Sequence, residues 1–101
     1  MAAPSPAQRI DAAIESGRYR LQAPGLDIPG MPLASRRDLL LTVRIPALDR
    51  MAEVDLAPVF SHFLDSGRER GNYTEEASIT IEKFGAPLQF KETIHVEFSR
   101  S

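Results

Sequence analysis

The sequence contains no cysteine and no tryptophan, and two tyrosines and five phenylalanines supply all of its aromatic side chains. The lack of cysteine excludes disulfides, thiolate metal sites and a cysteine nucleophile, and it agrees with a reducing compartment. No apolar run is longer than Leu39–Leu41, which is far short of a membrane span. Residues 1–8 carry neither the basic leader nor the apolar stretch of a signal peptide. We therefore expect a cytoplasmic protein with no membrane partner.

Motifs for catalysis and cofactor binding are also missing. Gly25 and Gly30 lack the Lys-Ser/Thr sequel of a phosphate-binding loop, and the sequence contains no Gly-x-Ser-x-Gly elbow. The net charge of −2 disfavours a dedicated nucleic-acid binder, which usually carries a clear positive excess. We expect no cofactor, no metal and no enzymatic activity.

A length of 101 residues with 43% hydrophobic content is typical of one domain with one core, here residues 1–101. The clearest strand pattern lies near the end of the chain, at residues 89–99. Because side chains alternate between the two faces of a strand, Phe90, Ile94 and Phe98 share an apolar face and their neighbours form a polar one. This strand is expected to form the floor of the core.

Two helices are indicated, over residues 5–16 and 55–66. Ser5 begins the first with a capping-box pattern, and Asp55 is the expected cap of the second. In the second segment the apolar residues follow helical spacing without a gap, which predicts a buried face. A glycine follows each segment and is expected to end it in a left-handed conformation.

Residues 77–84 and 89–99 are predicted to form an antiparallel hairpin. A four-residue loop, 85–88, would set the register so that Glu82 lies opposite Lys91, an attractive charge pair. A shift by one residue would set the apolar face of one strand against the polar face of the other, which disfavours it.

Two charged side chains, Lys83 and Glu92, lie on the apolar face of this hairpin. On the expected register they sit diagonally across the strands near the turn, where they reach each other or water. We interpret them as an ion pair at the rim that adds little stability.

The other segments have weaker patterns. Residues 38–45 alternate as a strand and are expected to pair with residues 89–99, which would make the C-terminal strand central. Residues 18–22 can add a short edge strand, residues 23–35 are expected to be an irregular apolar loop because of their prolines and glycines, and residues 1–4 a flexible tail.

Residues 47–54 are expected to hold one helical turn. Together these segments predict an α+β fold with a three- to four-stranded, mainly antiparallel sheet. The C-terminal strand is expected to be central, and two helices are expected to pack on one face of the sheet.

Either histidine is a candidate general base or metal ligand. His62 has Asp65 and Ser66 as helical neighbours, but a solvated helix face explains this better than a catalytic pair. His95 is expected on the polar sheet face beside the neighbouring strand. An enzyme or enzyme subunit that uses a histidine is therefore the least favoured of three functions.

The favoured function is a non-catalytic protein-interaction module, such as an adaptor, an assembly factor or an inhibitor of a larger complex. The irregular segment 23–35 would present apolar side chains to another protein, or a sheet edge would bind a second copy of the chain. The predicted interaction residues are Leu26, Ile28, Met31 and Leu33.

The alternative is binding of nucleic acid or another anionic ligand by arginines. Ten of the twelve basic residues are arginine, and several lie near one another in the sequence. Aromatic side chains that could stack on bases are scarce beside them, which makes nucleic acid the less favoured partner. The predicted anion-binding residues are Arg18, Arg20, Arg36 and Arg37.

Overall fold

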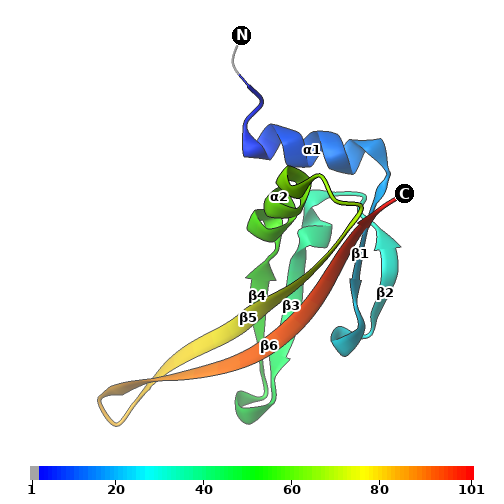
Figure 1. Cartoon of the computed structure of the whole chain (residues 1–101). Helices are drawn as coiled ribbons and strands as arrows, with labels where there is room; N and C mark the ends of the chain where they lie inside the picture. Colours follow the sequence, from blue (N-terminus) through cyan, green and yellow to red (C-terminus); the bar gives the residue numbers. More distant parts are fainter. Residues whose placement is uncertain (1–2) are drawn as a thin grey trace.

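The computed structural model describes residues 3–101, so the first two residues of the expected tail at 1–4 lie outside the described part. It shows an α+β fold with two helices, a four-stranded antiparallel sheet in the order β2-β1-β6-β5, and a separate two-stranded sheet, β3-β4 (Figure 1). In chain order the elements are α1 (Pro6–Ser16), β1 (Tyr19–Ala23), the 3₁₀ turn η1 (Pro24–Leu26), β2 (Ile28–Pro32), η2 (Arg36–Leu39), β3 (Leu40–Ile45), η3 (Pro46–Leu48), β4 (Arg50–Asp55), α2 (Ala57–Ser66), β5 (Arg70–Lys83) and β6 (Ala86–Arg100).

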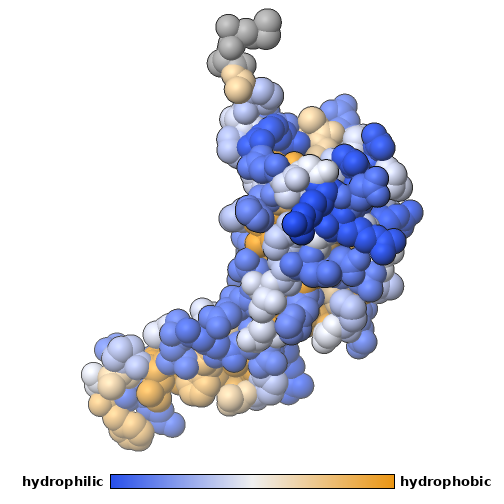
Figure 2. Space-filling view, in the orientation of Figure 1, coloured by the Kyte–Doolittle hydropathy of each residue, from blue (hydrophilic) through white to orange (hydrophobic). Residues whose placement is uncertain are grey.

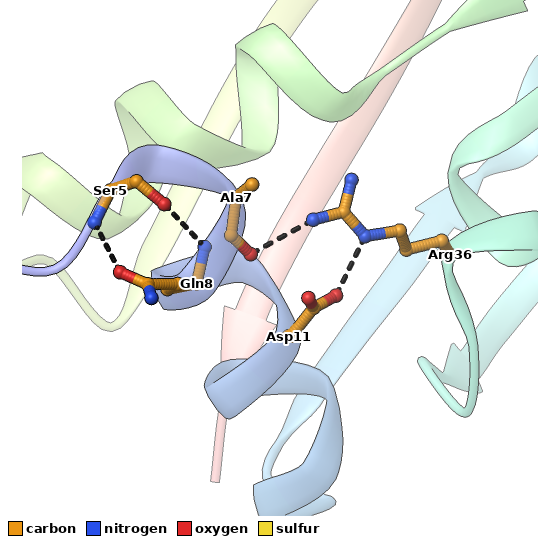
Figure 3. Close-up of polar contacts among 5 residues, drawn as sticks. All are labelled: Ser5, Ala7, Gln8, Asp11 and Arg36. Atoms are coloured by element: carbon orange, nitrogen blue, oxygen red, sulfur yellow. Dashed lines mark hydrogen bonds and ion pairs between the residues drawn. The ribbon is translucent and has the colours of Figure 1, made fainter.

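Both helices begin and end close to the expected residues. The Ser5 hydroxyl accepts a hydrogen bond from the Gln8 amide at 3.2 Å, and the Gln8 side chain accepts one from the Ser5 amide at 2.8 Å, which completes the capping box of α1 (Figure 3). The cap of α2 is Leu56 rather than Asp55. Asp55 still accepts a hydrogen bond from the Ala57 amide at 2.9 Å, so its carboxylate satisfies one of the unpaired donors of the first turn.

Helix α2 packs on one face of the four-stranded sheet through aromatic rings. Phe60 and Phe63 of α2 are buried against Phe98 of β6, with ring centroids 5.0 and 5.7 Å from its ring. Helix α1 lies on α2 and is joined to it by an ion pair between Arg9 and Asp65. Burial of each large ring contributes roughly 1.5–3 kcal/mol, which explains why the short helix α2 is stable here, whereas α1 is stabilised by packing Ile10 and Ala13 into the core.

Strand β6 lies inside the sheet, as expected, but its neighbours are β5 and β1. The expected pairing of residues 38–45 with 89–99 is wrong, because β3 pairs with β4 instead. The turn η3 and the left-handed Asp49, with φ 49°, reverse the chain where one helical turn was expected. The resulting hairpin buries one face, including Leu41 and Val43, against the main sheet.

Residues 23–35 also differ from expectation, because they are not an irregular loop. The chain reverses through η1 and Asp27, with φ 55°, and returns as β2 beside β1, with Met31 opposite Leu21. The same Pro-x-Leu-Asp turn therefore closes both short hairpins. Proline is tolerated in β2 because this strand is at the edge of the sheet.

The long β5–β6 hairpin forms, but the predicted register is wrong. Glu82 lies opposite Pro87, and Lys91 lies opposite Ser78 with its amine 3.5 Å from Glu76. The loop has two residues rather than four. Because the register moves by four residues, an even number, every side chain stays on its expected face.

Only the last part of β6, residues 97–100, pairs with β1. Toward the turn that joins them, β5 and β6 pair only with each other and form a two-stranded ribbon that projects from the rest of the molecule (Figure 1). The molecule is therefore elongated, with extents of 54 × 33 × 20 Å. We call residues 77–92 the arm and the remaining described residues the body.

Candidate interaction surface

One face of the arm is apolar although it extends beyond the body. Ile79 lies opposite Phe90 and Ile81 opposite Leu88, so four large apolar side chains form two adjacent rows. Leu88 is 42% exposed, whereas Ile79 and Phe90 are partly buried where the arm meets the body. Figure 2 shows hydrophobic residues gathered on this projecting lobe, while most of the visible surface of the body is hydrophilic.

The tip of the arm exposes a phenylalanine in an unusual backbone conformation. Phe84 is 95% exposed and has φ 54°, and Gly85 follows with φ 77°. Two-residue hairpin turns with positive φ at both positions favour Asn-Gly, because a left-handed conformation costs most residues about 1–2 kcal/mol. Phe84 therefore carries both a backbone cost and an exposed aromatic ring, and residues with strained backbone conformations cluster at functional sites.

The opposite face of the arm is polar. It carries Ser78, Thr80 and Glu82 on β5, and Gln89 and Lys91 on β6. Among residues 3–101, no strand pairs with the outer edge of β5 or with the outer edge of β6 between residues 86 and 96. The arm thus offers a partner one apolar face, one polar face and two strand edges.

The predicted interaction residues lie in the body, not in the arm. Leu33 is 1% exposed, and the other three pack partly buried against the body's own core. Leu26 also lines a hollow of about 240 Å³ at the root of the arm, together with Val43, Ile94 and Glu92. The hairpin β1–β2 uses most of the apolar surface that the sequence had indicated for a partner.

The predicted anion-binding arginines are divided between different roles. Arg20 and Arg70 both lie beside Ser99, on the polar face of three adjacent strands. The Arg18 guanidinium donates to the carbonyl of Ser101 at 3.0 Å, whereas Arg37 is exposed on η2. Arg70 was not among the predicted arginines, because its place beside Ser99 depends on the register of the long hairpin.

Arg36 joins η2 to α1. Its Nε donates to Asp11 at 2.6 Å, and its Nη2 donates to the Ala7 carbonyl at 2.9 Å (Figure 3). The hydrogen bond from Arg36 holds the pKa of Asp11 below its ordinary value, and the same contact raises the pKa of Arg36. This guanidinium is therefore engaged within the chain.

Each histidine lies beside a shallow hollow in the surface. The His95 ring lies 3.3 Å from the Thr74 hydroxyl, and the His62 ring lies edge-on to Tyr73 with centroids 5.9 Å apart. Within residues 3–101 neither histidine is in an ion pair with a carboxylate. The described residues also include no group of three or more metal-ligating side chains placed to hold an ion.

In the part of the chain that the structure describes, no helix has the length and apolar character needed to cross a membrane. Comparison with protein-family models, with curated proteins and with solved structures found no match to this chain.

Proposed function

We propose that this chain is a protein-interaction module that docks on a protein partner through the apolar face and tip of the arm. The observation that carries the proposal is Phe84, an aromatic side chain 95% exposed at the end of a projecting ribbon. Aromatic anchors of this kind contribute most of the binding free energy in protein interfaces when they enter a pocket. We place the interaction surface on the arm rather than on residues 23–35, because residues 23–35 are folded into the body.

The arrangement of the arm also favours a protein partner. A row of apolar side chains bordered by charged ones, such as Lys83 and Glu92, resembles the apolar core and polar rim of protein interfaces. The ribbon is joined to the body by continuous strands, so its backbone is already ordered before binding. Less conformational entropy is then lost on association than for a disordered segment.

The test is site-specific photocrosslinking in the cells that make the protein. A benzophenone amino acid replaces Phe84 or Leu88 on the apolar side, and Thr80 or Gln89 on the polar face in matched controls. We expect protein crosslinks from positions 84 and 88 and few from positions 80 and 89. Equal crosslinking from both faces, or none to any protein from position 84, would overturn the proposal.

A further inference from the structure

The apolar face of the arm has opposite charges at its two ends. From the root to the tip, the cross-strand rows are Ala77 with Glu92, Ile79 with Phe90, Ile81 with Leu88, and Lys83 with Ala86. The negative charge is therefore at the root, the positive charge is next to the tip, and four large apolar side chains lie between them. A small alanine accompanies each charge in its row.

The observed register prevents Lys83 and Glu92 from pairing within one chain. They lie six residues apart along the ribbon, which corresponds to about 20 Å. Among residues 3–101 neither is in an ion pair, and both side chains are exposed. The Lys83 amine instead lies 5.5 Å from the centroid of the Phe84 ring.

From this pattern we infer that the occupant of the arm is a second copy of the same chain, packed face to face with the two arms antiparallel. This inference rests on the proposed function. The antiparallel arrangement brings Lys83 of each copy toward Glu92 of the other and sets the two apolar bands against each other. A parallel arrangement would place Lys83 near Lys83 and Glu92 near Glu92, and like charges facing each other are destabilising.

The same arrangement gives Phe84 a place to bind. In an antiparallel pair the tip of one arm lies at the root of the other, where Glu92 borders the hollow of about 240 Å³. Leu26 and the largely buried Val43 and Ile94 supply its apolar walls. Arg44, Thr93 and His95 line it as well. Two equivalent rings would enter two equivalent hollows, as the two-fold symmetry of such a dimer requires.

The size of the interface predicts that the dimer is weak. The free face of the ribbon is about 10 Å wide and about 20 Å long, from the spacing of strands and residues. The two faces together bury less than the roughly 1,200–2,000 Å² of a stable interface. The monomer and dimer should therefore exchange, and association should depend on protein concentration.

Sedimentation velocity of the full chain, at concentrations from about 10 μM to about 1 mM, tests this inference through charge reversal. Lys83→Glu or Glu92→Lys alone places like charges at both ends of the interface, so each should weaken self-association roughly tenfold or more. When the two variants are mixed, each contact again joins opposite charges, so a heterodimer should form about as readily as the wild-type dimer. Matched controls on the polar face, Lys91→Glu and Glu82→Lys, should leave association unchanged.

A wild-type chain that stays monomeric throughout this range overturns the inference, and so does a dimer that ignores both reversals, as pairing through a strand edge would. Failure of the mixture to recover association also overturns it. If position 84 then crosslinks to a different protein, the proposed function stands without the inference. If it crosslinks to no protein, both fail.

Discussion

The body and the arm share the same strands but differ in what covers them. In the body, Ile94, Val96 and Phe98 of β6 are at most 3% exposed, under the helices and the β3–β4 hairpin. In the arm, Leu88 continues the same alternating face of the same strand and is 42% exposed. The alternation therefore defines an apolar face over the whole ribbon, whereas the rest of the chain buries this face completely only in the body. The apolar face of the arm is the surface on which we place a partner.

The largest difference in unfolding free energy should appear when a large apolar side chain of β6 is truncated in the body and, separately, in the arm. Phe98→Ala leaves a cavity under Phe60 and Phe63 and should lower the free energy of unfolding by about 3–5 kcal/mol. Leu88→Ala, on the same face of the same strand, should lower it much less, by about 0.5–1 kcal/mol, because the Leu88 side chain is 42% exposed in the folded chain. Urea unfolding of the two variants beside the wild type, at low protein concentration, measures both.

The low concentration matters because it keeps the chain monomeric. A loss of more than about 2 kcal/mol for Leu88→Ala under these conditions would show that the arm is part of the folding core. The distinction between the two regions would then fail.

The next effect has the opposite sign. Phe84→Asn keeps Gly85 and places at the first turn position a residue that adopts positive φ more readily. We expect the free energy of unfolding to rise by about 0.5–1 kcal/mol, which is part of the cost of a left-handed phenylalanine. Thermal unfolding measures the change, with Thr80→Asn as a control on the polar face of the arm. A decrease would mean that the Phe84 ring stabilises the monomer, and its exposure would then need another explanation.

The faces of the elements could be predicted from sequence, but their partners could not. Alternation assigned Ile94 to the core and His95 to the polar face, and helical spacing identified the buried side of α2. Pairing depends on long-range competition between strands, so the partner of residues 38–45 could not be read from that segment. The missed β4 carried a signal, because Ala52 and Val54 alternate with charged residues.

The candidate site was harder to predict, because it depends on a two-residue turn. Phe84 was read as the last residue of a strand, although Phe84-Gly85 stands between two alternating segments and could have been recognised as a tight turn. Proline cannot donate to a ladder, but Pro87 is tolerated because this part of β6 pairs with β5 alone and its other edge is free. Conversely, the apolar residues of 23–35 suggested a partner only because their own hairpin was not foreseen.

The smallest effect concerns the body alone and depends on pH. Arg36 donates a hydrogen bond to Asp11, so the pKa of Asp11 is lower in the folded chain than in the unfolded one. A carboxyl group with a lowered pKa stabilises the fold above pH about 4, and this contribution is lost as the pH falls through the folded-state pKa. The wild type should therefore lose slightly more stability between pH 6 and pH 3 than Asp11→Asn does. The urea midpoints of the two chains at both pH values measure the difference.

The partner residue provides the control. Arg36→Gln leaves the Asp11 carboxyl in place but removes the cation, so it should weaken the pH dependence of stability as much as Asp11→Asn does. The double variant should weaken this pH dependence no further than either single variant. If Asp11→Asn retains the full acid sensitivity of the wild type, the contact between α1 and η2 has no energetic weight in solution. Because both residues lie in the body, Leu88→Ala should leave this pH dependence unchanged. A change there would mean that the arm and the body are energetically coupled.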